Sequence, residues 1–312
     1  MTAPDPRFAG LSCYTSGLAG YHAAEFAGTA DRFAGSVRVA VRTDLPGEQL
    51  AFSHHRTPLD RLPDGSRLVW ATAPPGGVVE AVGAELQRHG RVLVVTDNAA
   101  LPWSPAPGGG AHAPHWLLVD GRRGDDWHVV DGFSGLLPAG EQHPYAGWLG
   151  TAGLLAAMTP PPSWRAEQQR RNALAFGFWM PTPDGGPQWL VRTDRAAVAP
   201  GLPGEWLLDE DTVLAFLCDH VVARPDAAGT YLEDLWAVSQ HRTFRYRHLG
   251  DGEAVRAWAD LPRALRFAVE SAQRGRPRPA LIRTTFDNLR RLERDRATTP
   301  TPAAELPHRQ TL

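Results

Sequence analysis

Hydrophobic and polar positions form two neighbouring patterned stretches near the middle of the chain. The runs His115–Asp120 and Trp127–Asp131 are short and mostly apolar, and the segment Arg122–Asp126 between them is polar and contains a glycine. This arrangement predicts an antiparallel β-hairpin. His115 opens the first run and Asp131 closes the second. Pairing across the turn therefore brings them to the same end of the hairpin, offset by about two residues.

The rest of the first half has the periodicities of both strands and helices. Short apolar or alternating runs predict strands at Ser36–Arg42, Arg67–Thr72 and Gly90–Thr96. Helical spacing predicts one helix from Cys13 to about Phe26, with Ser12 as its N-cap, and another over Gly77–His89. We therefore expect an α+β fold with a mainly antiparallel sheet.

The pattern changes after Met158, where a proline-rich segment predicts a linker between two domains, residues 1–158 and 163–296. Apolar residues at helical spacing then dominate, and the second domain is expected to be mostly helical. The residues 297–312 are rich in Thr and Pro and predict a disordered tail. The expected helices are Trp164–Phe176, Asp211–Arg224, Tyr231–Tyr246, Glu253–Gln273 and Ala280–Arg294, with strands at Gly177–Met180 and Gln188–Thr193.

Composition excludes several classes of function. The chain has 312 residues and a formal net charge of −2, with no basic block, so we expect no nucleic-acid partner. All 32 basic residues are arginine, which excludes catalysis by a lysine Schiff base. No apolar run of about 18 residues and no signal-peptide pattern is present, so we expect a cytoplasmic protein without a membrane span. Two distant cysteines form no metal motif, and we expect neither metal nor cofactor.

One of these cysteines lies where a nucleophile is favoured. Cys13 begins a predicted helix, whose N-terminus carries partial positive charge and favours a thiolate, and small residues flank it. The alternative is a buried, inert cysteine. That alternative fits Cys218, which lies within an apolar run at helical spacing. Cys13 is therefore the candidate nucleophile, with His115 as its base and Asp131 as the carboxylate that orients the imidazole.

Three other histidines compete with His115 for the role of base. His128 lies in the middle of the second predicted strand, away from the end where Cys13 is expected. His112 and His143 lie in segments rich in Gly or Pro, where nothing local is expected to hold their rings. These positions favour His115.

The Cys–His–Asp order resembles that of the papain-like cysteine-enzyme superfamily, in particular its C39-peptidase-like branch. Over about residues 8 to 140 the chain is also similar to the N-terminal domain of the butirosin biosynthesis protein H family. That pattern is an apolar strand ending in Asp, a Leu-Pro-aromatic turn, a His strand and an Asp strand. It corresponds here to Arg91–Asp97, Leu101–Trp103, His115–Gly121 and His128–Asp131.

The resemblance implies a papain-like catalytic domain that transfers an acyl group. An acyl carrier protein would present the group as a phosphopantetheine thioester. Cys13 would take it up and pass it to an amine on a small-molecule acceptor, with His115 as general base and Asp131 orienting it. The expected function is thus a biosynthetic acyltransferase or chain-releasing enzyme. Aromatic residues of the second domain would shape the acceptor pocket.

The chain departs from the family pattern at one position. Papain-like proteases carry an oxyanion-hole Gln about six residues before the Cys, and Arg7 occupies that position here. A backbone N–H near Cys13 can replace it. The further candidates for substrate binding or the oxyanion hole are Ser12, Thr15, Asp97 and Trp103, although Asp97 also fits a turn cap. Two alternatives stay open: a cysteine peptidase, amidase or thioesterase of the same fold, and a non-catalytic binding member of it.

Overall fold

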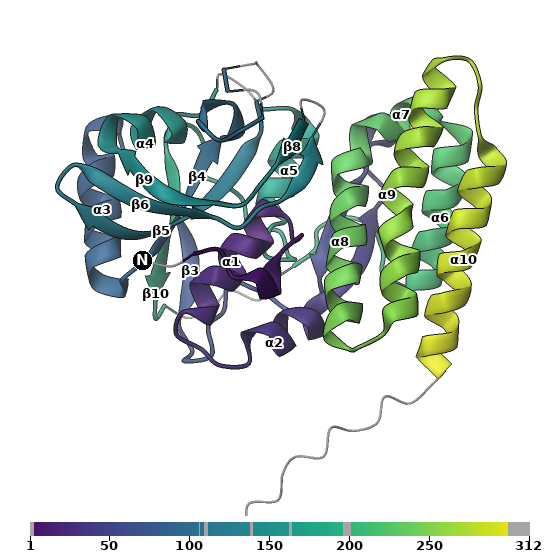
Figure 1. Ribbon diagram of the computed structural model, residues 1–312, viewed down its shortest axis with the longest axis horizontal. Coiled ribbons are helices and arrows are strands. Elements are labelled where there is room, and N and C mark those ends of the chain that lie inside the picture. Colours follow the sequence, from purple (N-terminus) through teal and green to yellow (C-terminus); the bar gives the residue numbers. More distant parts are fainter. Residues whose placement is uncertain are drawn as a thin grey trace, which may run out of the picture.

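The computed structural model describes residues 3–105, 107–108, 112–137, 140–161, 164–195 and 201–298. It is an α+β structure in which antiparallel sheets occupy the N-terminal half and a mostly helical region follows (Figure 1). The expected α+β class and the helical second half are confirmed at this level. Within the described residues, no helix is long and apolar enough to cross a bilayer.

A six-stranded antiparallel sheet forms the centre of the N-terminal half, in the order β3-β10-β4-β5-β6-β9. Its central hairpin has the predicted register, since Leu118 pairs with Val130 and His115 is thus two positions from the residue opposite Asp131. The strands are β3 (Arg67–Thr72), β4 (Val92–Asp97), β5 (Pro114–Arg123), β6 (Asp126–Asp131), β9 (Tyr145–Gly150) and β10 (Gln188–Thr193).

Helices cover both faces of this sheet, and its central strands are therefore buried on both sides. On β5, Trp116 and Leu118 belong to the apolar cluster formed with α1, whereas Leu117 and Val119 belong to the cluster formed with α3 and α4. This is the alternation expected of a strand between two layers. The helices of this half are α1 (Cys13–Ala23), α2 (Thr29–Ser36), α3 (Val78–His89), α4 (Thr151–Met158) and α5 (Ala166–Ala173).

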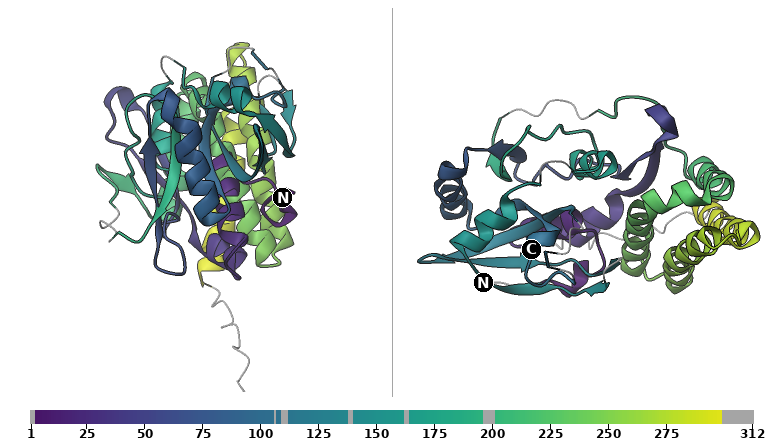
Figure 2. Two further views of the ribbon diagram at one scale, coloured as in Figure 1. Left: turned by 90° about the vertical axis from the view of Figure 1, so that its left-hand side faces the viewer. Right: turned by 90° about the horizontal axis from the view of Figure 1, so that it is seen from above.

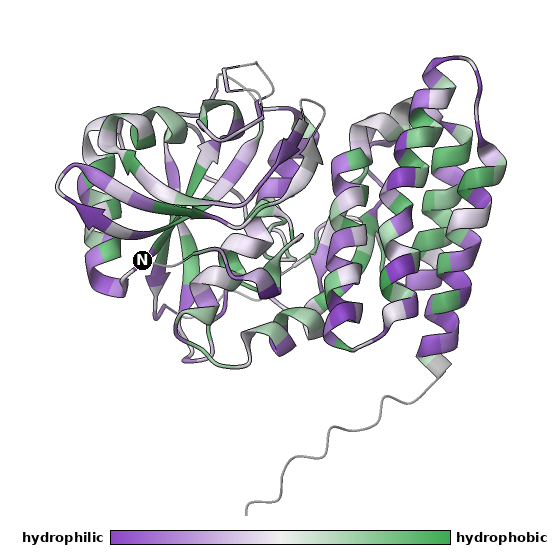
Figure 3. Cartoon of the chain, viewed as in Figure 1, coloured by the Kyte–Doolittle hydropathy of each residue, from purple (hydrophilic) through white to green (hydrophobic). Residues whose placement is uncertain are grey.

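The C-terminal region is a group of packed helices beside the sheet (Figures 1 and 2). Its core contains Trp258 and Phe286, and Figure 3 shows hydrophobic and hydrophilic residues interleaved along the long helices, as in amphipathic helices. The helices are α6 (Glu210–Ala223), α7 (Pro225–Ala228), α8 (Leu232–His248), α9 (Gly252–Gln273) and α10 (Pro279–Thr298).

Two small sheets complete the fold, and one of them joins the two halves. The three-stranded sheet β11-β1-β2 contributes Val39, Val41 and Phe52 to the core of the C-terminal helices. Its strands are β1 (Val37–Arg42), β2 (Ala51–His55) and β11 (Trp206–Leu207), and β7 (Gly135–Leu137) pairs with β8 (Gly140–Gln142). Short 3-10 turns lie at Pro6–Phe8, Pro46–Glu48, Pro75–Gly77, Asn98–Ala100 and Gly229–Tyr231.

The structure departs from the sequence predictions at several places. The expected strand Gly177–Met180 is absent, because the chain bends back there and Met180 N–H donates to Ala173 of α5. The central sheet extends beyond residues 1–158, since β10 pairs with both β3 and β4. The residues 297 and 298 belong to α10, and 299–312 of the expected tail lie outside the described residues.

Candidate active site

Cys13 is the first residue of α1 and is half-buried. Ser12 is the N-cap, and its Oγ accepts the Thr15 N–H at 3.4 Å, so the start of the helix is fixed by a side chain. The helix can lie close to β4 because Gly17 faces Leu93, where a Cβ would be 3.1 Å from Cδ2. The sulfur atom is therefore carried at the N-terminal end of a tightly packed helix.

His115 and Asp131 form a buried hydrogen-bonded pair at the end of the hairpin. His115 Nε2 lies 2.9 Å from Asp131 Oδ2, and both residues are almost completely buried. This bond uses Nε2 of the imidazole and leaves Nδ1 for a second partner. Cys13 lies near enough to His115 for its charge to be among the causes that raise the pKa of the imidazole. The structure thus brings together the three residues expected to form a triad.

Asp131 is held by three further donors. Trp103 Nε1–H donates to Oδ2 at 2.8 Å and Gln142 Nε2–H at 3.0 Å, while the Phe133 N–H donates to Oδ1 at 2.9 Å. The Trp103 ring stacks on Tyr145 with ring centroids 4.1 Å apart. Trp103 therefore lies beside the triad and orients its carboxylate. Gln142 was not predicted as a site residue, because the three-residue strand that carries it is too short to show a periodicity in the sequence.

The charge state of the imidazole follows from these contacts. Burial lowers the pKa of His115, but the charges of Asp131 and Cys13 and the hydrogen bond that the imidazole donates to Asp131 outweigh burial and raise it to about 10. His115 is thus an imidazolium at neutral pH. For the other cysteine, Cys218 in α6, burial raises the pKa of the thiol, so it stays protonated in an apolar environment.

The competing histidines have other partners. His128 is opposite Gly121, in the interior of the hairpin, and its Nδ1 lies 2.5 Å from Asp120 Oδ1. His143 is largely exposed. His112 differs from expectation, because its ring is held locally: Nδ1 lies 2.5 Å from an oxygen of Asp97, a contact that the glycine-rich segment did not suggest.

Asp97 caps the turn that follows β4. Its Oδ1 accepts the N–H groups of Ala99 and Ala113, each at 3.2 Å, in addition to the His112 contact through Oδ2. These bonds fix the chain on both sides of the loop that leads into β5. Asp97 therefore shapes the segment in front of His115 and does not join the Cys13–His115–Asp131 group.

The hydroxyls of Ser12 and Thr15 point into the protein interior. Ser12 Oγ–H donates to Thr15 Oγ1 at 3.0 Å, and Thr15 Oγ1 lies 3.2 Å from His55 Nε2. Both hydroxyls are engaged there, so neither has a free hydrogen for an oxyanion. Arg7 is exposed and paired with Asp5. The N–H groups of Cys13 and Tyr14, in the first turn of α1, have no intrahelical acceptor and remain as backbone donors at this end.

Aromatic rings link the candidate site to the C-terminal helices. Phe133 packs edge-on against His115 and against Trp236 of α8, each with ring centroids 5.5 Å apart. Trp236 is half-buried and extends the wall beside the imidazole. Sequence periodicity placed Trp236 on a helix but gave no indication of which part of the sheet that helix meets.

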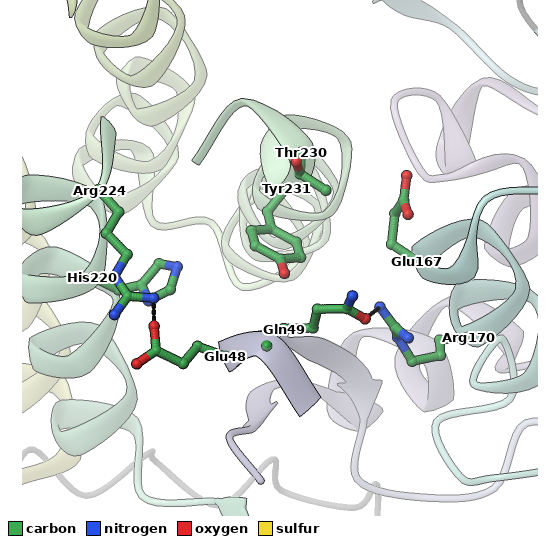
Figure 4. Close-up of a pocket in the computed structure, with 9 residues that line it drawn as sticks. Glu48, Gln49, Glu167, Arg170, His220, Arg224, Thr230 and Tyr231 are labelled. Atoms are coloured by element: carbon green, nitrogen blue, oxygen red, sulfur yellow. Dashed lines mark hydrogen bonds and ion pairs between the residues drawn. The ribbon is translucent and has the colours of Figure 1, made fainter. Parts of the chain in front are cut away.

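A separate cavity of about 230 Å³ lies where the two halves meet (Figure 4). Its lining comes from the loop before β2, from α5 and α6 and from the Gly229–Tyr231 turn, and none of the triad residues contributes. Arg170 donates to Gln49 at 2.8 Å across it, and Arg224 pairs with Glu48. This polar cavity is distinct from the candidate active site.

Among the described residues, no cluster of three or more His, Cys, Asp or Glu side chains has a geometry that could hold a metal ion. The assembled group of a half-buried cysteine, an imidazolium and a fixed carboxylate can carry out nucleophilic acyl chemistry. No protein-family model matches the chain, and no curated protein matches it either.

Proposed function

We propose that the protein is a cysteine-dependent acyltransferase with a papain-like catalytic domain, acting on a carrier-protein thioester in natural-product biosynthesis. The observation that carries this proposal is the position of His115, which lies between Cys13 and Asp131 and has its pKa raised to about 10. An imidazolium beside a cysteine favours the thiolate, which is the nucleophilic form of sulfur.

The reaction proceeds in two halves. The Cys13 sulfur attacks the thioester carbonyl, and the Cys13 N–H stabilises the oxyanion that develops. The bond to the carrier sulfur then breaks, and His115 gives its proton to the departing thiolate. The acceptor amine next attacks the acyl-enzyme and gives a proton back to His115, and the Cys13 thiolate leaves. The products are an amide and the free thiol of the phosphopantetheine arm.

The choice of a thioester donor follows from chemistry. Exchange between two thioesters is nearly isoenergetic, so a cysteine nucleophile needs little driving force to accept the group. An amide donor is harder to cleave and calls for strong oxyanion stabilisation. The engaged hydroxyls of Ser12 and Thr15 and the exposed Arg7 leave this end with few donors. This difference favours transfer over peptide cleavage.

The proposal is tested by intact-mass analysis with an acyl N-acetylcysteamine thioester, which carries the same thioester as the end of a phosphopantetheine arm. One acyl mass should appear on the peptide that contains Cys13. The matched variants are Cys13→Ser, which should not form the thioester, and Cys218→Ser, which should react normally. Labelling that persists in Cys13→Ser, or no labelling at all, contradicts the proposal.

The way in which the acylated protein loses its acyl group distinguishes an acyltransferase from a thioesterase. Primary amines added to the acylated protein should discharge it as amides faster than water does. Hydrolysis at the same rate with and without amines would instead indicate a thioesterase. Cleavage of peptides without any thioester labelling would indicate a peptidase.

A further inference from the structure

A buried chain of hydroxyl and imidazole groups begins at the N-cap of α1. It runs from His241 of α8 through Ser12 and Thr15 to His55 of β2 and Ser36 at the end of α2. The successive distances are 3.3, 3.0, 3.2 and 3.0 Å. All five side chains are buried. We call this chain the histidine–hydroxyl relay.

The hydrogen bonds of Ser36 determine which groups donate and which accept along the relay. Ser36 Oγ–H donates to the Phe33 carbonyl at 2.7 Å, so its single hydrogen is used there. His55 Nδ1–H must therefore donate to Ser36 Oγ. Burial lowers the pKa of His55 well below its usual value and keeps the ring neutral, so Nε2 carries no hydrogen. Nε2 of His55 accepts from the Thr15 hydroxyl.

The donors and acceptors at the N-terminus of α1 follow from the assignment at His55. Because Thr15 Oγ1–H is given to His55, its oxygen accepts the hydrogen of Ser12 Oγ. Ser12 then has no hydrogen left, and the contact with His241 must be a bond from Nε2–H of that ring to Ser12 Oγ. Ser12 Oγ thus donates once and accepts twice, from the Thr15 N–H and from His241.

We propose that His241 is a positioning residue for Cys13, because its Nε2–H holds the Ser12 cap from which the nucleophile helix starts. The residue comes from the C-terminal helical region and acts on the sulfur through Ser12, the neighbour of Cys13 in the chain. This inference rests on the proposed role of Cys13 as the nucleophile.

Two further contacts of α8 support this role. The Gln240 side chain lies against Gly10, where a Cβ would be 2.9 Å from Oε1, so α8 also touches the segment just before Cys13. Trp236 packs on Phe133, which itself contacts His115. The helix α8 therefore contacts both the segment that precedes Cys13 and the Phe133 ring that packs on His115. These contacts fix the position of Cys13 relative to His115.

The test compares two substitutions of nearly equal shape in a Cys218→Ser background, so that Cys13 is the single thiol. His241→Gln keeps an N–H donor at the position of Nε2, whereas His241→Met has none. Iodoacetamide alkylation of Cys13 should be slowed about tenfold in His241→Met and restored close to the parent rate in His241→Gln. Equal rates in the parent and His241→Met overturn the proposal. Equal slowing in both variants does so too, because packing alone would then be responsible.

His54→Met serves as the matched control. It removes a buried histidine whose ring packs on His241 with centroids 5.0 Å apart, but which has no bond in the relay. The alkylation rate of Cys13 should not change in this variant. A rate as low as that of His241→Met would assign the effect to packing of the cluster and would contradict the proposal.

A spectroscopic measurement on the unsubstituted protein needs no variant to fold. Long-range ¹H–¹⁵N correlation of the imidazole rings should show His241 as the Nε2–H tautomer and His55 as the Nδ1–H tautomer. The Nδ1–H tautomer at His241 overturns the proposal. Alkylation also separates the two proposals, since it reports on Cys13 without a thioester. A His241-dependent alkylation rate without thioester labelling would remove the proposed function and leave the positioning role.

Discussion

The carboxylate of Asp131 receives four hydrogen bonds, from His115, Trp103, Gln142 and the Phe133 backbone. A buried carboxylate with this many donors is fixed in orientation, and the imidazole bonded to it is fixed as well. Residues that hold a catalytic side chain in place often affect the rate nearly as much as the reacting groups do, because a small displacement of a reacting group slows the reaction.

Asp131→Asn should slow acylation of Cys13 strongly while the protein stays folded. The amide loses the negative charge that helps to raise the pKa of His115, and it can favour the wrong tautomer. The corresponding change in a serine triad costs about 10⁴ in turnover, and we expect less here because a thiol ionises more readily. Asp120→Asn, which alters the partner of His128, is the control and should acylate normally. Equal slowing of both variants would contradict the assignment.

The His115–Asp131 pair should also make stability fall at high pH. The pKa of His115 is raised from 6.5 to about 10, so the folded state binds more protons than the unfolded state between these values. The contribution is complete below pH about 6.5 and is lost as the pH rises through about 10. Urea unfolding of the parent and of His115→Gln at pH 7 and pH 10 measures this. The stability difference between them should narrow at pH 10, and a constant difference would refute the assigned charge state.

At the scale of elements, a strand could be predicted where its buried residues are apolar and could not where they are polar. The hairpin of β5 and β6 was predictable, as were β3 and most of β4, because each is an apolar run bounded by turns. The strand β2 was missed because its sequence, Ala51–His55, includes Ser53, His54 and His55, all of which are buried. Its polar side chains are satisfied or enclosed by distant segments, and no local pattern reveals that.

Some residues of the candidate site could be predicted from the sequence and others could not, for a similar reason. Cys13, His115 and Asp131 were found because each lies at the end of a readable element. Gln142 and Trp236 were not, since their positions beside the site depend on how a short strand and a distant helix pack. Pairing of β10 inside the central sheet was likewise invisible, because strand order depends on contacts between segments far apart in the chain.

Gly177 marks the bend that replaced an expected strand, and its substitution should destabilise the protein. Its φ is +87°, and a Cβ there would lie 2.5 Å from the carbonyl oxygen of His55. Gly177→Ala should lower the free energy of unfolding by about 3 kcal/mol, through both backbone strain and the clash. Gly185 is the matched position, with φ +66° and no described atom within 4 Å of an added Cβ. Gly185→Ala should cost only about 1 kcal/mol. Equal losses in urea unfolding would show that the close approach at Gly177 has no effect.

For the whole molecule, α8 is one of the helices through which the helical region meets the sheets. It contributes His241 to the relay, and Asp234, which pairs with Arg171 of α5 at 2.8 Å. The rings of His54 and His55 from β2 lie about 5 Å from that of His241, so three neutral imidazoles are enclosed at this contact. Burial lowers the pKa of each well below its usual value.

This enclosed cluster should make the contact between the two halves sensitive to acid. A group whose pKa is lowered in the folded state binds protons more readily when unfolded, so stability is fully present above pH about 6.5 and is lost as the pH falls below it. Arg171 and Arg38 lie near His54 and oppose its protonation further. The free energy of unfolding of the parent should therefore fall between pH 7 and pH 4.5.

His54→Met isolates the contribution of one member of the cluster. Neither nitrogen of His54 has a hydrogen-bond partner among the described residues, so the substitution removes two unsatisfied buried atoms and one acid-sensitive group. At pH 7 the variant should be about 1 kcal/mol more stable than the parent. The stability difference between the variant and the parent should grow at pH 4.5. At that pH the unfolded parent binds a proton at His54 that the folded parent does not, and this destabilises the parent alone. The largely exposed His143 provides the control, and His143→Met should follow the parent at both pH values. Urea midpoints that fall in parallel for the parent and His54→Met would show that acid acts elsewhere in the molecule.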